Sequence, residues 1–138
     1  MNREPDRPNG TPPKQPSKGL NILIVEDNED TATTTAILLR LYGHEVRIAM
    51  DGPAALQAAK DGFPDVVLVD IGLPGMDGYE VARKIGEQPT ERRPLFIALT
   101  GFGPERHSAD GIIDLHLLKP LDPDRLEKVL RRFQRVIM

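Results

Sequence analysis

Four short apolar runs, each ending at a polar or charged residue, constrain the fold of this chain most strongly. They cover residues 21–25, 65–69, 94–99 and 115–118. The runs are rich in Val, Leu and Ile and lack the alternation expected of strands that face water on one side. Strands that are apolar on both faces are typical of a parallel sheet covered by helices on both sides. A fifth segment, residues 44–50, alternates more, and we interpret it as an edge strand.

The segments between these runs carry start signals for helices. Asn28 is a good N-cap for the first helix, and Pro53 suits the first turn of the second. Asp77, followed three residues later by Glu80, resembles a capping box for the third. Pro123 opens the last helix, whose apolar residues recur with a spacing of three and four: Leu126, Val129, Leu130, Phe133, Val136 and Ile137. Strands and helices in alternation predict an α/β fold, a doubly wound five-stranded parallel sheet with five helices.

Composition divides the chain into two parts. Residues 1–18 hold five of the 13 prolines and no apolar residue after Met1. Such a segment buries too little apolar surface to offset the entropy lost on ordering, so we expect a disordered Pro-rich leader. The remainder, residues 19–138, is the right length for one domain with a single core.

Several classes of function are disfavoured by composition. The chain has no cysteine, which rules out disulfides, thiol catalysis and cysteine-based zinc sites. Its net charge of −3 argues against a nucleic acid partner, because binding to the phosphate backbone usually needs a basic face. No apolar run approaches the length of a membrane span, so we expect no membrane partner and a cytoplasmic location.

Polar residues whose side chains can bind a metal or take part in catalysis lie at the ends of four predicted strands. They are Glu26, Asp27, Asp70, Thr100 and Lys119. In open parallel sheets, ligands bind outside the carboxyl ends of the strands, so these side chains are expected to meet at one edge.

The chemistry of this group of residues is specific. Three carboxylates held together repel one another, and a hard divalent cation such as Mg²⁺ relieves that repulsion. One carboxylate can then act as nucleophile toward a phosphoryl group and form an aspartyl phosphate. Lys119 adds a compact positive charge for the phosphoryl oxygens, and Thr100 adds a hydroxyl donor. The sequence therefore predicts Mg²⁺-dependent phosphoryl transfer at this edge of the sheet.

Four motifs make the sequence resemble a response regulator receiver domain over residues 20–136. They are Val-Glu-Asp-Asn at 25–28, Val-Asp-Ile-Gly-Leu-Pro-Gly-Met-Asp-Gly at 69–78, Ala-Leu-Thr-Gly at 98–101, and Leu-Lys-Pro at 118–120. The string from Asp70 to Gly78 is the most specific of them. The resemblance implies a flavodoxin-like receiver fold and a role in two-component or phosphorelay signalling.

The resemblance also implies a role for each metal-site residue. Asp70 would be the phosphoacceptor and a ligand of Mg²⁺. Asp27 would be a direct Mg²⁺ ligand, Glu26 would act beside it, often through water, and the backbone carbonyl of Gly72 would complete the site. The phosphoryl donor would be a phosphohistidine on a sensor histidine kinase or a histidine phosphotransfer protein.

Thr100 and Lys119 would contact the phosphoryl group and carry the conformational signal, by the same resemblance. The peptide bond between Lys119 and Pro120 would be cis. Output would pass through contacts with a downstream protein that the sequence does not identify. The chain would be a phosphoacceptor that assists its own phosphorylation, not an enzyme that turns over a separate substrate.

The sequence departs from the family pattern at three places. His116 stands where the family often has Tyr or Phe, and it either switches as that residue does or lines the surface. Residues 104–111 leave room for about two turns, so we predict a short or irregular fourth helix. Gly72 and Phe102, two residues beyond Asp70 and Thr100, cannot hydrogen-bond an attacking water, which predicts slow self-dephosphorylation.

Three other interpretations remain open at this point. The chain is alternatively a degenerate receiver that acts as a phosphorylation-independent interaction module, or a receiver segment of a hybrid histidine kinase. An enzyme with an aspartyl-phosphate intermediate is disfavoured, because such enzymes commonly carry a second Asp as general acid two residues after the nucleophile. Here that position is Gly72.

Overall fold

The computed structural model describes residues 19–73, 75–90, 92–101 and 111–137. Five parallel strands form one sheet in the order β2-β1-β3-β4-β5. The strands are β1 (Asn21–Val25), β2 (Glu45–Ala49), β3 (Val66–Asp70), β4 (Leu95–Thr100) and β5 (Leu115–Leu118). In the described residues the helices are α2 (Glu29–Leu41), α3 (Gly52–Asp61), α4 (Gly78–Gly86) and α5 (Pro123–Ile137). The predicted five-stranded parallel sheet is confirmed, and β2 lies at its edge as expected.

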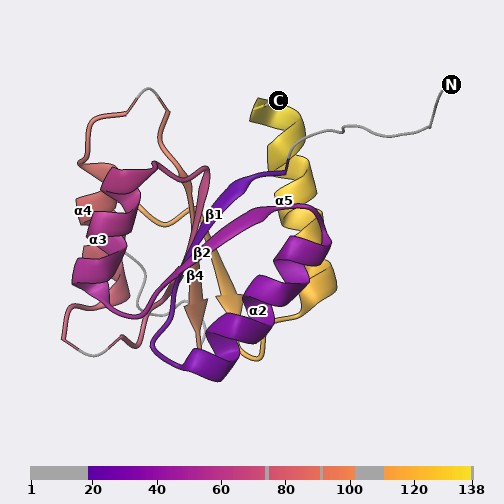
Figure 1. Cartoon of the computed structure of the whole chain (residues 1–138), viewed down its shortest axis with the longest axis horizontal. Helices are drawn as coiled ribbons and strands as arrows, with labels where there is room; N and C mark the ends of the chain where they lie inside the picture. Colours follow the sequence, from indigo (N-terminus) through magenta and orange to yellow (C-terminus); the bar gives the residue numbers. More distant parts are fainter. Residues whose placement is uncertain (1–18, 74, 91, 102–110, 138) are drawn as a thin grey trace, which may run out of the picture.

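The helices cover both faces of the sheet, with α2 and α5 on one side and α3 and α4 on the other (Figure 1). Val67 and Leu68, neighbours in β3, are both fully buried but belong to different halves of the core. Leu68 packs in the cluster with α2 and α5, and Val67 in the cluster with α3 and α4. Burying each such side chain contributes about 1.5–3 kcal/mol. This two-sided burial is the reason why the central strands are apolar throughout.

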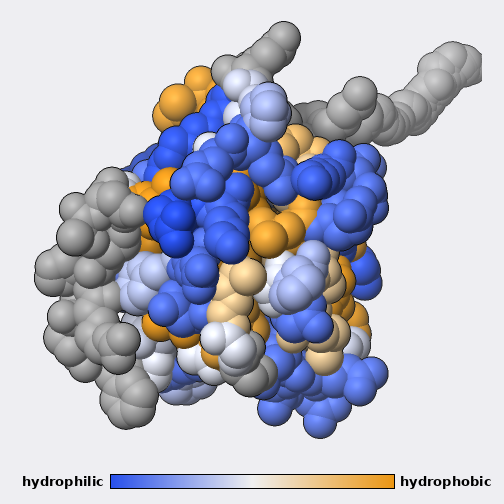
Figure 2. All heavy atoms as spheres, turned by 90° about the vertical axis from the view of Figure 1, so that its left-hand side faces the viewer, coloured by the Kyte–Doolittle hydropathy of each residue, from blue (hydrophilic) through white to orange (hydrophobic). Residues whose placement is uncertain are grey.

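The surface on the side of α3 and α4 is mainly polar (Figure 2). Viewed from the side of α3 and α4, the molecule is largely hydrophilic, with smaller hydrophobic areas between the polar groups (Figure 2). The apolar residues of α3 and α4 that are buried face the sheet: Ala55, Ala59, Val81, Ala82 and Ile85. In the last helix, Leu126 and Leu130 are buried as the spacing predicts, but Val136 is 80% exposed. The predicted apolar stripe of α5 therefore includes one residue, Val136, that does not pack against the core.

Capping side chains define where the helices begin. The Asn28 side chain accepts a hydrogen bond of 2.9 Å from the backbone N–H of Thr31 at the start of α2. Asp77 accepts one of 2.9 Å from the N–H of Glu80 in the same way at the start of α4. Each cap contributes about 1 kcal/mol. The cap of α2 matters, because its three consecutive threonines at 33–35 are poor helix formers.

The bounds of β2, β3 and β4 differ by one residue from the sequence interpretation. Asp70 is the last residue of β3, and Thr100 is the last residue of β4, where each was expected just beyond the strand. The backbone pairing continues because Asp70 lies in register with Leu99, and Thr100 with Leu118. The backbone of both residues is therefore held in the sheet.

Some sequence interpretations fall outside the described residues. The Pro-rich leader, residues 1–18, lies there, and so does Phe102. The predicted short or irregular fourth helix covers residues 104–111, of which only Gly111 is described. Within the described ranges, none of the helices is both long and apolar enough to cross a membrane.

Candidate functional site

The carboxyl ends of the parallel strands meet at one edge of the sheet. Glu26 directly follows β1, and Lys119 directly follows β5, whose neighbour is β4. The N–H of Lys119 donates to the carbonyl of Thr100 at 2.8 Å, which ties the two strand ends together. The residues expected at this edge lie there: Glu26, Asp27, Asp70, Thr100 and Lys119.

Asp70 is held by contacts to both of its carboxylate oxygens. Its side chain is largely buried, and the residue is only 7% exposed. Oδ1 accepts a hydrogen bond of 2.9 Å from the backbone N–H of Gly72. Oδ2 lies 3.0 Å from Nζ of Lys119. The carboxylate is therefore fixed in one orientation at the open edge of the sheet.

Glu26 is a buried acid, and one of its oxygens has no hydrogen bond within the described part of the chain. Oε2 accepts from the backbone N–H of Asn28 at 3.1 Å. Oε1 accepts no hydrogen bond from the described residues and lies 3.5 Å from Nζ of Lys119. Burial raises the pKa of Glu26, and the nearby Asp70 adds to this effect, whereas the Asn28 N–H and Lys119 oppose it. The negative charge of Glu26 is thus incompletely compensated within the described residues.

The three acids of the site are close enough to share a cation. Oxygens of Glu26, Asp27 and Asp70 all lie within 4.8 Å of one another. Asp27 is exposed, whereas the other two acids are buried. Hard divalent ions such as Mg²⁺ prefer oxygen ligands of this kind together with water. The donor set and the uncompensated oxygen of Glu26 therefore fit Mg²⁺.

Lys119 is the only lysine or arginine with an ion pair to these acids in the part of the chain that the structure describes. Burial by itself lowers the pKa of Lys119, but the hydrogen bond and charge of Asp70, with a further contribution from Glu26, raise it above its ordinary value. The lysine therefore stays charged at neutral pH. The peptide bond between Lys119 and Pro120 is cis, as the resemblance implies.

His116 lies in β5, three residues before Lys119, and is partly buried. Its Nε2 lies 3.2 Å from the hydroxyl of Tyr79 in the first turn of α4. The sequence interpretation singled out His116 but not Tyr79. No sequence signal would have found Tyr79, because the two residues are 37 positions apart and meet only through the fold.

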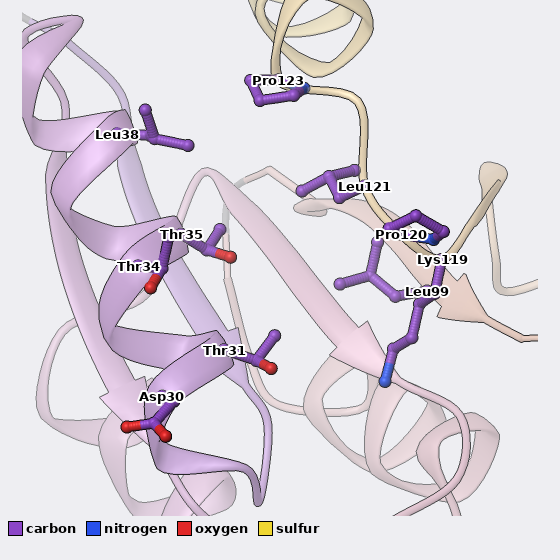
Figure 3. A pocket seen from close by; sticks show the side chains of 10 residues that line it. All are labelled: Asp30, Thr31, Thr34, Thr35, Leu38, Leu99, Lys119, Pro120, Leu121 and Pro123. Atoms are coloured by element: carbon purple, nitrogen blue, oxygen red, sulfur yellow. The ribbon is translucent and has the colours of Figure 1, made fainter.

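A groove of about 660 Å³ lies beside Lys119, between α2 and the segment from Lys119 to Pro123. Thr31, Thr35 and Leu38 project from α2 toward that segment (Figure 3). Leu99, Pro120 and Leu121 also line the groove. No local sequence pattern predicts this surface. Of the threonines at 33–35, which are poor helix formers, Thr34 and Thr35 line the groove.

Comparisons with known proteins found similar domains. Residues 22–131 match the family of response regulator receiver domains. Response regulator PleD of Caulobacter vibrioides is 38% identical over 122 residues, which cover 84% of this chain and 27% of PleD. This chain thus spans about a quarter of the length of that relative.

Two solved receiver domains are similar in structure. A CheY-like receiver domain from Methylobacillus flagellatus has a TM-score of 0.78 at 31% identity, covering 85% of this chain and 99% of that one. The receiver domain of sensor histidine kinase PA1611 from Pseudomonas aeruginosa has a TM-score of 0.72 at 33% identity, covering 83% of this chain and 97% of that one. That second structure has a magnesium ion coordinated in its active site cleft. Because the family match takes in nearly all of the sheet and its site, this chain belongs to the response regulator receiver domains of two-component systems.

Proposed function

We propose that the chain is a signalling switch that accepts a phosphoryl group on Asp70. The observation that carries the proposal is the orientation of this carboxylate, which the Gly72 N–H and the Lys119 ammonium hold at the edge of the sheet. An oxygen of Asp70 attacks the phosphorus of a phosphohistidine and forms the new O–P bond. The N–P bond breaks, its electron pair stays on the imidazole nitrogen, and the phosphoryl group becomes an acyl phosphate.

Mg²⁺ is the cofactor of this proposal. Glu26, Asp27 and Asp70 would hold it with carboxylate oxygens, and Gly72 with its backbone carbonyl. When bound, the ion would neutralise charge on the acids and on the incoming phosphoryl oxygens. The close approach of the three carboxylates and the magnesium ion in the PA1611 receiver support this assignment.

Lys119 and Thr100 are the proposed partners of the phosphoryl group. The ammonium of Lys119 already lies 3.0 Å from Asp70, so it is placed to contact a phosphoryl oxygen added there. Thr100 is buried at the end of β4 and linked to Lys119 through the backbone. Movement of these two residues toward the phosphoryl group would bias the domain between two states, with His116 as a further switch residue.

The proposed donor is a sensor histidine kinase or a histidine phosphotransfer protein, acting in the cytoplasm. We assign the groove beside Lys119 as the docking surface for this donor. The groove adjoins the edge of the sheet that carries Asp70, and Leu38, Leu99 and Leu121 give it an apolar lining. A helix lying there would bring a histidine on its surface toward Asp70. The downstream partner of this chain would be another protein, and neither nucleic acid nor a membrane would take part.

A receiver is a signalling domain and not a classical enzyme. In our proposal the domain assists the gain and loss of its own phosphoryl group. Gly72 has no side chain to orient a water, and Phe102 lies outside the described residues, so slow self-dephosphorylation stays a prediction. A receiver segment of a hybrid kinase is the second candidate, because PA1611, whose receiver is similar to this chain, is a sensor histidine kinase.

Intact-mass spectrometry after incubation with acetyl phosphate tests the proposed function. We expect one added phosphoryl group in the presence of Mg²⁺, none after chelation, and none in Asp70→Asn. A chain that gains no phosphoryl group under conditions that label another receiver would instead be a phosphorylation-independent interaction module.

A further inference from the structure

Tyr79 and His116 form a polar contact between two elements of the domain. Tyr79 is the second residue of α4, and His116 is the second residue of β5. The Tyr79 hydroxyl lies 3.2 Å from Nε2 of His116, and it donates a hydrogen bond when that nitrogen carries no proton. The ring centroids are 6.1 Å apart with an angle of 51° between the planes, so the rings do not stack face to face. In that tautomer the hydrogen bond constrains the orientation of the imidazole.

The α4 end of this contact is attached to the phosphoacceptor backbone. Gly78, which precedes Tyr79, packs so closely that a Cβ there would lie 2.6 Å from the carbonyl oxygen of Asp70 and 2.8 Å from Cα of Ile71. The N–H of Gly78 also faces the carbonyl of Ile71 at 3.4 Å. The first turn of α4 therefore cannot shift independently of the chain that carries Asp70.

The β5 end of the contact leads to the same carboxylate from the other side. His116 pairs with Ala98 in the sheet, and β5 ends two residues later at Leu118. Lys119 follows. Its backbone N–H donates to the carbonyl of Thr100, and its ammonium lies 3.0 Å from Asp70. His116 is thus connected to Asp70 in two directions, through Tyr79 and α4 and through Lys119.

We propose that Tyr79 is a positioning residue that holds His116 and makes its orientation depend on the state of Asp70. The inference rests on the proposed function, in which a phosphoryl group on Asp70 draws Lys119 and Thr100 toward itself. Besides the strand pairing, the Lys119 ion pair and the Tyr79–His116 hydrogen bond then both connect β5 with the segment that carries Asp70. A change at Asp70 moves the two ends of this hydrogen bond relative to each other.

Nitrogen NMR of the histidine rings tests this in the full chain. Spectra are recorded at about pH 8, above the ordinary titration range of histidine, so that ring protonation does not obscure the contact. The samples are wild type, Tyr79→Phe and Tyr42→Phe, each before and after treatment with Mg²⁺ and acetyl phosphate. Tyr42 is the matched control, because it is the other tyrosine of the chain and lies at the end of α2. His116→Gln assigns the His116 signals.

Two results are expected. In the unphosphorylated protein, Tyr79→Phe shifts the Nε2 signal of His116 toward that of a water-exposed imidazole, several-fold more than Tyr42→Phe does. In wild type, phosphorylation shifts the same signal, and Tyr79→Phe removes most of that response although intact mass shows that Asp70 is still phosphorylated.

The proposal is overturned if Tyr79→Phe leaves the free-state signal unchanged. It is also overturned if phosphorylated wild type and phosphorylated Tyr79→Phe show the same His116 response, or if neither shows any. Absence of phosphorylation by intact mass in wild type would refute the proposed function itself, and with it the dependence of His116 on Asp70. In that case the free-state comparison still reports whether Tyr79 orients His116.

Discussion

At the scale of single residues, the site contains a buried carboxylate, Glu26, whose negative charge the described part of the chain does not fully compensate. Glu26 is 2% exposed, and burial raises its pKa. The folded state therefore holds a proton on Glu26 more tightly than the unfolded state does. Between the ordinary pKa near 4.5 and the raised value, stability falls as pH rises, so the charged form is destabilising at neutral pH.

Replacing Glu26 with Gln is thus expected to have opposite effects on stability and on metal binding. Without Mg²⁺, Glu26→Gln unfolds at a higher urea concentration than wild type at neutral pH, because a buried charge is removed. It also binds Mg²⁺ roughly tenfold or more weakly, which a titration followed by NMR measures. Glu29→Gln, an exposed acid in the first turn of α2, is the control and changes neither quantity appreciably. A Glu26→Gln protein with unchanged Mg²⁺ affinity would contradict the assignment.

A second buried titratable residue lies away from the site. His44 is 7% exposed, and its Nδ1 accepts a hydrogen bond of 3.0 Å from the N–H of Leu20. Its Nε2 lies 3.9 Å from a carboxylate oxygen of Glu127 in α5. Burial lowers the pKa of His44, and Glu127 opposes this effect without cancelling it.

The pH dependence of stability follows from this lowered pKa. Below the ordinary histidine pKa near 6.5, the unfolded chain binds a proton that folded His44 does not, so stability falls as pH decreases from about 7 to 5. His44→Asn keeps an acceptor for the Leu20 N–H but does not titrate. We expect the urea midpoint of wild type to fall more over this range than that of His44→Asn. Equal losses in the two proteins would show that His44 does not contribute.

At the scale of elements, the contact between α4 and β3 sets the geometry of the phosphoacceptor loop. Gly78→Ala tests it, because the added methyl group would meet backbone atoms of Asp70 and Ile71 that cannot rotate away. We expect a loss of about 1–3 kcal/mol in the free energy of unfolding, typical of an overpacked position. Phosphorylation by acetyl phosphate is expected to slow at the same time, since Asp70 must shift.

Gly101→Ala is the matched control for this prediction. Among the described residues, a Cβ at Gly101 would meet nothing within 4 Å, although the residue directly follows Thr100. Urea unfolding and the rate of mass gain are measured for both variants. If Gly78→Ala were as stable and as reactive as Gly101→Ala, the close packing of α4 against the acceptor loop would not matter for function.

Much of the element scale was predictable from the sequence, for physical reasons that differ between elements. The central strands were found because burial on both faces leaves apolar residues at every position, as with Val67 and Leu68. The caps at Asn28 and Asp77 were found because capping depends on local spacing. β3 ends one residue later than predicted, at Asp70, because a polar side chain at the carboxyl end of a strand does not interrupt backbone pairing.

At the scale of the whole molecule, the contacts that the parallel sheet itself aligns were predictable, and those made by helix packing were not. The sequence indicated that Glu26, Asp27, Asp70 and Lys119 meet, because a parallel sheet aligns its carboxyl ends. It did not indicate that Tyr79 reaches His116, or that the groove beside Lys119 opens against α2. These contacts depend on how helices pack across the sheet, which no local pattern specifies.

The central claim for the whole molecule is that phosphoryl transfer ends on Asp70 and requires Mg²⁺. Trapping with borohydride tests it most directly, because this reagent reduces an aspartyl phosphate to homoserine with release of phosphate. After incubation with acetyl phosphate and Mg²⁺, borohydride treatment and peptide mass mapping, we predict homoserine at position 70 and at no other acid. Chelation of Mg²⁺ is predicted to abolish the product. Homoserine at Asp27 or Glu26 in place of Asp70, or no trapped product in a sample whose intact mass shows phosphorylation, would contradict the account.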